Sequence, residues 1–496
     1  MKLVSASAMR ELDRRTIDEF GIPGEELMHV AGEGLADALR ELASRHQLVD
    51  SPVLFVAGCG NNGGDAFVAA ASLHEDGWPV ECWLAGDEGK LKGDALSSFK
   101  KLKKAGVPLQ VMDTPDAWKH ASEAGTDAEI VVDGLLGTGA AGEPRGVIAD
   151  AIRFADAQAE RALIVSIDVP SAMRVRADLT VTMGLPKIDC VQSEYLDCVG
   201  NLEVVDIGIP EALLEQVDGD SELALIHASD LAPLFPRRSR DAHKGDYGHV
   251  LCIGGTKGFS GAITMASRAA ARAGAGLVSA FVPEAIHALV ASAIPEVMVH
   301  ASMPEGKWSA ILAGCGMGRS ATTREQVLQL LDTSAVPLIL DADAITVLAE
   351  HVDAIAAARC PVVLTPHPGE FAALFGFKVK DVQEDRVGMA RMAADKLGAI
   401  IVLKGAGTLV AAPGSAVAVN MTGNPGMASG GSGDVLAGII AALAGQGLSA
   451  VQAACAGVWL HGRAGDLAAA EKSQASLIAP DLIDKLADAF RSLSCR

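Results

Sequence analysis

The sequence predicts an α/β protein in which helices cover parallel sheets, and three observations support this prediction. Half of the 496 residues are apolar, whereas aromatic residues make up only 4%, which suits closely packed helices on strands. Short apolar segments typical of strands alternate along the chain with segments typical of helices. Many of the strand segments end in glycine-rich turns, where such sheets bind ligands. The chain is too long for a single core, so we expect two or three domains.

Charge and cysteine content restrict the kinds of partner and the compartment. The formal net charge of −21 argues against nucleic acid or an anionic membrane, because both bind basic surfaces. No segment reaches the roughly 18 uninterrupted apolar residues of a membrane-spanning helix, and residues 1–11 become charged too early for a signal peptide. The nine cysteines lack CxxC spacing and are expected to be reduced thiols. We therefore expect a cytoplasmic protein that forms a closed homo-oligomer, the usual state of such proteins.

In the first domain, predicted at residues 1–215, helices precede a doubly wound sheet. Residues 7–46 are expected to be helical, with Ser7 as an N-cap and a break at 21–24. The alternation of strand and helix then begins. The expected strands are 53–57, 79–85, 130–133 and 163–168, and the expected helices are 66–74, 93–105 and 147–157.

Polar side chains follow three strands of this sheet, at the edge where ligands are expected. They are Asn61, Asn62 and Asp65 after strand 53–57, Asp133 at the end of strand 130–133, and Asp168 with Ser171 at and after the end of strand 163–168. Oxygen atoms of Asn62, Asp133 and Ser171 would suit an alkali cation. Asp168 would serve as an acid or a base. The alternative is that Asp133 and Asp168 are cap or turn residues.

Residues 216–244 interrupt the alternation and are predicted to be a linker. This segment holds a basic run, Arg237, Arg238, Arg240 and Lys244, in an otherwise acidic chain. Such a run is either a solvated loop or, beside a phosphate site, a contact for the tail of a nucleotide.

The second domain, predicted at residues 245–496, restarts the alternation. Its expected strands are 249–255, 277–282, 310–313, 338–340, 362–364 and 400–403, and its first expected helix is 262–273.

Polar or glycine-rich turns follow several of these strands and are expected at one edge of the sheet. Lys404 and the amides of residues 405–408 would suit a nucleotide, because they combine a cation with unhindered N–H groups. His367 lies between two prolines and is either a ligand contact or a packed loop residue.

A glycine-rich loop at residues 422–433 leads into the apolar helix predicted from Val435 to Leu443. Free N–H groups at such a helix start make an anion site, and phosphate is the usual anion. Asp434 would be unfavourable there unless it takes a proton from a hydroxyl that attacks a phosphoryl group. The alternative is that Asp434 merely caps the helix.

These motifs resemble two known families along nearly the whole chain. Residues 244–486 resemble the ribokinase-like ADP- or ATP-dependent NAD(P)H-hydrate dehydratases, through KGDYGH at 244–249, DAD at 341–343, HPGE at 367–370, KGAGT at 404–408 and GSGD at 431–434. The first half resembles the Rossmann-like NAD(P)H-hydrate epimerases, through NNGGD at 61–65, DGLLGTG at 133–139, SIDVPS at 166–171 and VDIGIP at 205–210. Joined in this order, they resemble the bifunctional bacterial repair enzymes.

The resemblance implies the chemistry of the second half. Hydrated nicotinamide cofactors exist as S and R forms, and the dehydratase would phosphorylate the S hydroxyl and expel phosphate, with Asp434 as the base. Magnesium would screen the phosphoryl charge, and ADP is the expected donor. The resemblance also implies contact residues, namely Ala262, Gly316, Gly318, His367 and Asp434 for the hydrate and Lys404, Gly405, Ala406, Gly407, Thr408 and Gly433 for the nucleotide.

For the first half, the resemblance implies that the R and S hydrates are interconverted, with Asp168 as a catalytic residue. It implies a potassium ion at Asn62, Asp133 and Ser171. The family usually has glycine where Ala66 and Ala172 stand, and a longer loop after Ser171, so we expect a site that is present but altered. The implied hydrate contacts are Asn61, Asn62, Gly63, Gly64, Asp65, Gly137, Thr138, Gly139, Ala140, Ala141, Gly142, Glu143 and Asp168.

Two other functions fit the residues. A ribokinase-like kinase of a small molecule would use the same glycine loop and Asp434, but would release a stable phosphorylated product. A dehydratase with a non-catalytic first half would leave the R hydrate unchanged.

Overall fold

The computed structural model describes residues 1–140 and 142–493 and divides the chain into two compact units. The first unit is Lys2–Ser221, and the second consists of Met1 with Glu222–Arg496. The structure differs from the prediction of a linker at 216–244, because Leu223–Leu225 form a strand of the second sheet. This strand is only three residues long and pairs with a distant partner, so local sequence gives little sign of it.

Within the described residues, the first unit contains one sheet of seven parallel strands, in the order β3-β2-β1-β4-β5-β6-β7. The strand order reverses between β1 and β4, so their carboxyl ends form the crevice where doubly wound sheets bind ligands. The strands are β1 Val53–Ala57, β2 Val80–Leu84, β3 Leu109–Val111, β4 Ile130–Gly134, β5 Leu163–Ile167, β6 Leu179–Met183 and β7 Asn201–Val205.

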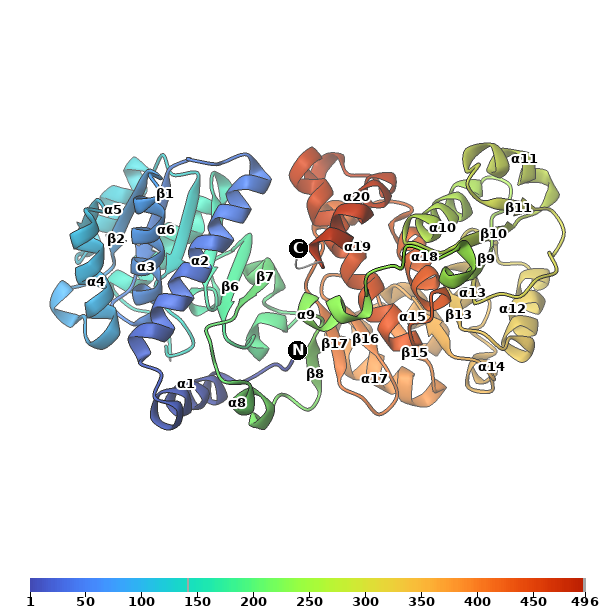
Figure 1. The fold of residues 1–496 in the computed structure, drawn as a ribbon, viewed down its shortest axis with the longest axis horizontal. Coiled ribbons are helices and arrows are strands. Elements are labelled where there is room, and N and C mark those ends of the chain that lie inside the picture. The colour runs from blue at the N-terminus through green and yellow to red at the C-terminus, as the bar shows by residue number, and fades with distance from the viewer. Residues whose placement is uncertain (141, 494–496) are drawn as a thin grey trace. The chain divides into compact units, whose positions relative to one another are not determined.

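Helices cover the first sheet (Figure 1). Ser5, rather than the predicted Ser7, caps the first helix by accepting a hydrogen bond from the N–H of Ala8, and Gly21 ends that helix in the left-handed conformation. The helices are α1 Ala6–Phe20, α2 Gly24–His46, α3 Asn61–Glu75, α4 Gly93–Ala105, α5 Pro115–Ala124, α6 Val147–Ala157, α7 Leu196–Val199 and α8 Glu211–Gln216.

The described part of the second unit contains one sheet of ten strands, in the order β11-β10-β9-β12-β13-β14-β15-β16-β17-β8. The strands from β11 to β15 are parallel, whereas β16 runs antiparallel to both of its neighbours. The strands are β8 Leu223–Leu225, β9 His249–Ile253, β10 Leu277–Phe281, β11 Met298–His300, β12 Ala310–Ala313, β13 Leu338–Leu340, β14 Val362–Leu364, β15 Ile400–Leu403, β16 Thr408–Ala411 and β17 Val417–Asn420.

Helices flank this second sheet as well (Figure 1). They are α9 Ala228–Leu231, α10 Ser260–Arg272, α11 Glu284–Ala293, α12 Ala321–Thr333, α13 Asp343–Thr346, α14 Val352–Ala356, α15 Pro368–Phe375, α16 Val379–Glu384, α17 Arg386–Leu397, α18 Ser432–Gly445, α19 Ala450–Lys472 and α20 Ala479–Ser492.

Helix α18 is the central helix of the second unit. All of its residues from Val435 to Gly445 are buried, as the apolar run predicts. It packs closely on α10, because a Cβ at Gly438 would lie 2.1 Å from the carbonyl oxygen of Ala266. This packing fixes the start of α18 relative to the sheet. Across the described residues, none of the helices combines the length and apolar character needed to cross a membrane.

Candidate active sites

The start of α18 has the form of an anion site. Its N-cap is Gly431, whose φ of +97° is left-handed and therefore favours glycine. Asp434 is the third residue of the helix, so the alternative prediction that it is the cap is wrong. Because the cap offers no side-chain acceptor, the first N–H groups of α18 are available to an anion.

The Asp434 carboxylate lies in an acidic, partly buried cluster. Ligand atoms of Cys315, Asp341 and Asp434 are within 4.8 Å of one another. Burial raises the pKa of Asp434 from 3.8 to about 6, and the negative charge of Asp341 adds to this effect. A carboxylate with such a pKa can take up a proton near neutral pH, as a general base must.

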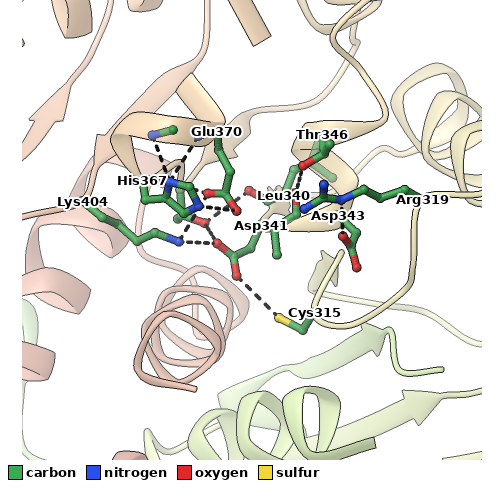
Figure 2. Close-up of polar contacts among 12 residues, drawn as sticks. Cys315, Arg319, Leu340, Asp341, Asp343, Thr346, His367, Glu370 and Lys404 are labelled. Atoms are coloured by element: carbon green, nitrogen blue, oxygen red, sulfur yellow. Dashed lines mark hydrogen bonds and ion pairs between the residues drawn. The ribbon is translucent and has the colours of Figure 1, made fainter. Parts of the chain in front are cut away.

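Lys404 supplies the positive charge of this cluster (Figure 2). Its Nζ lies 2.8 Å from Oδ1 of Asp341 and 3.8 Å from Oε2 of Glu370. Burial alone would lower the pKa of Lys404, but these two carboxylates outweigh it and raise the pKa. A Cβ at Gly433 would lie 3.2 Å from the same Nζ, so the structure brings Lys404 to the first turn of α18.

Asp341 was not predicted as a site residue, yet it organises the cluster. Its side chain is buried, and its Oδ1 also accepts a hydrogen bond of 2.6 Å from Oγ1 of Thr365. On its other oxygen it faces the thiol of Cys315, at 3.8 Å (Figure 2). The sequence shows an aspartate after a strand, but not that it pairs with a lysine 63 residues away.

His367 is the N-cap of α15. Its Nδ1 accepts hydrogen bonds from the N–H groups of Gly369 and Glu370, and the Glu370 carboxylate accepts the N–H of His367 in return. His367 therefore has a structural role at the start of α15, as the predicted alternative to a ligand contact implies. Nε2 of His367 lies 3.4 Å from Oε1 of Glu370, so the Glu370 carboxylate also contacts this atom of the exposed ring (Figure 2).

The other predicted hydrate contacts of this half come close together. A Cβ at Gly316 would lie 3.1 Å from Cβ of Ala262, so the turn after β12 meets the first turn of α10. The N–H of Gly318 donates to Oδ2 of Asp343, at 2.8 Å, and Arg319 bonds the other oxygen of that carboxylate (Figure 2).

The predicted nucleotide loop is held from behind by Arg386, which the sequence did not indicate. This buried guanidinium donates to the carbonyl oxygens of Leu403, Lys404 and Ala406, while its Nε has no partner among the described residues. Gly405 passes close to it at φ +144°. Thr408 donates to the carbonyl oxygen of Gly405 and begins β16.

The basic run of residues 237–244 does not lie at this edge of the sheet. Arg238 stacks on the ring of Tyr247, at 3.8 Å, and donates to the carbonyl oxygen of Gly274. Tyr247 precedes β9 and Gly274 precedes β10, so both mark the amino ends of the strands. The predicted contact between this run and the nucleotide tail is therefore wrong.

In the first unit, Asp133 lies at the end of β4 and is completely buried. Its carboxylate accepts hydrogen bonds from Oγ of Ser166 and from both the N–H and the Oγ of Ser171, at 2.6–3.0 Å. It also accepts the N–H of Leu135, as a turn residue would. Burial raises the pKa of Asp133, and only these neutral groups offset it.

Asp168 has a left-handed φ of +66° after β5 and forms an ion pair with Lys187. Its Oδ1 lies 2.5 Å from Nζ of Lys187 and accepts a hydrogen bond from Thr182. Burial alone would raise the pKa of Asp168, but the ammonium group of Lys187 outweighs it and holds the pKa below its ordinary value. Lys187 is 1% exposed, and nothing in the sequence marks it as buried.

The structure gathers the predicted residues of the first half at the crevice between β1 and β4. Asn61 to Asp65 form the first turn of α3, and Asn62 donates to the carbonyl oxygen of Ile167. A Cβ at Gly137 would lie 2.9 Å from Oδ1 of Asn62, and the N–H of Thr138 points to Asp168 at 3.5 Å. Gly139, Ala140 and Gly142 line the same exposed loop, whereas Ala141 lies outside the described residues.

The short segment after Ser171 folds as a tight turn. Ala172 and Met173 have φ values of +54° and +52°, which non-glycine residues rarely adopt. Arg174 then forms a double hydrogen bond with Glu143, at 2.8–2.9 Å. This contact ties the shortened segment to the loop predicted to hold the hydrate.

Comparisons with known proteins agree along the chain. The profile of the family described as "NAD(P)H-hydrate dehydratase" matches residues 250–488, and that of "YjeF-related protein N-terminus" matches residues 24–188. The chain is 38% identical over 521 aligned residues to the "Bifunctional NAD(P)H-hydrate repair enzyme Nnr" of Moorella thermoacetica, covering 99% of this chain and 97% of that protein. It is 34% identical to the protein of the same name from Escherichia coli, covering 97% of this chain and 92% of that protein.

A solved structure resembles the second unit. It is the ADP/ATP-dependent NAD(P)H-hydrate dehydratase of Bacillus subtilis, co-crystallised with ATP/Mg2+. The match has a TM-score of 0.50 and 30% sequence identity, and it covers 54% of this chain and 98% of that one.

Proposed function

The chain belongs to the family of bifunctional NAD(P)H-hydrate repair enzymes, and on this premise we propose how its two halves divide the work. The first half is an NAD(P)H-hydrate epimerase, and the second is a nucleotide-dependent NAD(P)H-hydrate dehydratase. We assign residues 1–215 to the epimerase and 245–496 to the dehydratase, whose sheet also includes Leu223–Leu225 from the segment between them. The chain passes from one compact unit to the other between residues 221 and 222, and this division supports two independent sites.

The position of Asp434 in the first turn of α18 is the observation on which the dehydratase mechanism rests. A base next to free helix amides can deprotonate the hydroxyl of the S hydrate while those amides hold the transferring phosphoryl group. Elimination of the resulting phosphate ester restores the ring double bond. Ala262, Gly316, Gly318 and His367 would hold the hydrate.

The nucleotide would lie against Lys404–Thr408 and Gly433, with ADP as the favoured donor. Support comes from the charge of Lys404 beside the α18 amides and from the ATP and magnesium of the Bacillus subtilis structure. The carboxylates of Asp341 and Asp434 are hard oxygen donors close enough to share a cation, so they fit magnesium, whereas the thiol of Cys315 does not. Magnesium would neutralise charge on the transferring group.

The epimerase half would use Asp168 for proton transfer and a potassium ion near Asn62, Asp133 and Ser171. These residues offer only oxygen ligands. Among the described residues, the buried Asp133 carboxylate accepts hydrogen bonds from neutral groups and forms no ion pair, so a monovalent cation would offset its negative charge. The hydrate would lie against residues 61–65, 137–143 and 168.

We also propose a cytoplasmic location and a homo-oligomer. The thiols of the described cysteines are free, which suits a reducing compartment. Closed assemblies are common among enzymes of this size.

The test is recovery of NADH from a mixture of S and R hydrates, with ADP, magnesium and potassium, while spontaneous epimerisation is slow. Full recovery is expected. Recovery that stops at the S fraction would overturn the epimerase assignment, and a stable phosphorylated product would indicate a small-molecule kinase instead.

A further inference from the structure

Helix α1 carries two buried polar atoms that no role assigned so far explains. Oδ1 of Asp13 and Oγ1 of Thr16 are buried and have no hydrogen-bond partner among the described residues. Asp13 and Thr16 are three residues apart, so they lie on the same face of the helix. Buried polar groups without partners are rare in native proteins, and a polar ligand or ordered water is the usual explanation.

This face of α1 borders the epimerase site. Arg10, one turn before, donates to the carbonyl oxygen of Thr138 at 3.0 Å, and Thr138 belongs to the loop that would hold the hydrate. Met9 touches the turn after β6, because a Cβ at Gly184 would lie 2.6 Å from its Cε. Asp13 follows these contacts along the helix and is close enough to Lys187 and Asp168 for their charges to act on the pKa of its carboxyl group.

Lys187 has all of its donors engaged. Its buried ammonium group lies 2.5 Å from Asp168, 3.1 Å from Oγ1 of Thr182 and 2.7 Å from the carbonyl oxygen of Met183. Lys187 therefore has no free proton for a substrate, and its structural effect is to fix the Asp168 carboxylate in place as an anion.

We propose that Asp13 is the proton donor of the epimerase half and that Lys187 is the positioning residue that holds Asp168 ready as the proton acceptor. This inference rests on the proposed epimerase function. It adds one catalytic residue and one positioning residue to the site.

The reaction needs both a donor and an acceptor. The hydrated carbon can be inverted by breaking its C–O bond while the lone pair of the ring nitrogen forms a C=N bond. Asp13 gives a proton so that the hydroxyl leaves as water. Water then adds to the opposite face, the C=N electrons return to nitrogen, and Asp168 takes the released proton. Proton exchange between the two carboxyls through water restores the starting state, so atoms and electrons balance without a co-reactant.

The surroundings shift the pKa values of the Asp13 and Asp168 carboxyl groups in opposite directions. Burial raises the pKa of Asp13 to about 6, with Lys187 lowering and Asp168 raising it, whereas Lys187 keeps the pKa of Asp168 low. Burial, with the negative charges of Asp168 and Asp13, raises the pKa of Asp65 well above its usual value, although Lys187 acts in the opposite direction. The thiol of Cys190 also faces the carbonyl oxygen of Asp168, at 4.0 Å. This division matches the donor and acceptor that the reaction needs.

The first test compares the full-length chain with Asp13→Asn, Asp13→Glu and the matched control Asp18→Asn, using purified R hydrate. Asp18 is on the same helix but on its exposed side, paired with Arg14. We expect Asp13→Asn to lower kcat by about 10²- to 10⁴-fold at pH 6, with KM within about threefold, because general acid catalysis contributes that much. Asp13→Glu should recover part of the loss, and Asp18→Asn should match the wild type.

The pH dependence of kcat distinguishes a proton donor from a residue that has only a structural role. Because the donor must be protonated, the wild-type kcat should fall as pH rises above about 6, and Asp13→Asn should lose that decline. An Asp13→Asn chain that keeps kcat within threefold of the wild type, or keeps the decline, would overturn the donor role. So would a series in which Asn is tolerated better than Glu.

Lys187 is tested with Lys187→Met and Lys187→Arg. Without the ammonium group the Asp168 carboxylate should hold its proton to higher pH, so Lys187→Met should lose more activity at pH 5.5 than at pH 8, and Lys187→Arg should restore the wild-type profile. An equal loss at every pH would overturn the positioning role. A wild-type chain without epimerase activity would overturn the proposed function and this inference together, whereas an active wild type with an equally active Asp13→Asn chain would overturn the inference alone.

Discussion

Replacing Asp434 with Asn should stabilise the second unit while stopping dehydration. The folded state raises the pKa of this carboxyl from 3.8 to about 6. At pH 8 the carboxylate is ionised in both states, and the folded state is disfavoured by 1.36 kcal/mol for each pH unit of that shift, or about 3 kcal/mol. Asn keeps the shape of the side chain without the charge, so the variant should be more stable by up to about 3 kcal/mol.

The pH dependence fixes the sign of this effect. Below pH 3.8 the carboxyl is protonated in both states, so the variant and the wild type should have similar stability. The difference should grow between pH 4 and 6 and stay constant above pH 6. Over the same range, dehydration of the S hydrate should fall by about 10²- to 10⁴-fold, because the general base is lost.

The assay is thermal and urea denaturation at pH 4, 6 and 8, following the transition that ADP shifts, since ligand binding identifies the second unit. Asp484→Asn on the exposed face of α20 is the matched control and should change the unfolding free energy by less than about 0.5 kcal/mol. A stability gain over the wild type that is no larger at pH 8 than at pH 4, or dehydration within threefold of the wild type, would refute the reasoning.

Three further predictions follow from the same geometry. Lys404→Met leaves the Asp341 carboxylate buried without its cation, so it should destabilise the second unit by about 3 kcal/mol and raise the KM for ADP; unchanged melting would contradict this. Burial lowers the pKa of His461 from 6.5 to about 4. The unfolded chain binds a proton at this histidine more readily than the folded chain, so the second unit should lose up to about 3 kcal/mol of stability as pH falls from 6.5 to 4, and His461→Phe should remove this loss. Stability curves of the variant and the wild type that run parallel over this pH range would contradict the prediction. Replacing potassium with lithium should slow epimerisation but leave dehydration of the S hydrate unchanged, and equal rates in both salts would exclude the proposed cation.

The fold could be predicted where local pattern decides structure. Strands β12, β13 and β14 begin and end at the predicted residues, because each is a short apolar run between turn residues. Strands β8, β16 and β17 were not predicted, since β8 pairs with a segment nearly 200 residues away and β16 reverses direction only through its pairing with β15. Local sequence carries no information on such partners.

Some residues of the two sites could likewise be predicted from local sequence, whereas others could not. Asp434 stands out because a run of glycines precedes it, and its place in the first turn of α18 follows from Gly431. Lys187 and Arg386 look like ordinary surface cations in the sequence, but both are buried in the structure. Whether a charged side chain is buried depends on tertiary packing, and neither periodicity nor motif spacing reports it.

The central claim is that one chain holds two separate activities, one depending on Asp168 and the other on Asp434. Mixing two inactivated chains tests it most directly, with purified R hydrate, ADP, magnesium and potassium. Asp434→Asn alone should regenerate no NADH, and Asp168→Asn alone should regenerate it no faster than spontaneous epimerisation allows, whereas an equal mixture should approach the wild-type recovery. A mixture no better than Asp168→Asn alone, although Asp434→Asn still binds ADP, would contradict the assignment of separate sites.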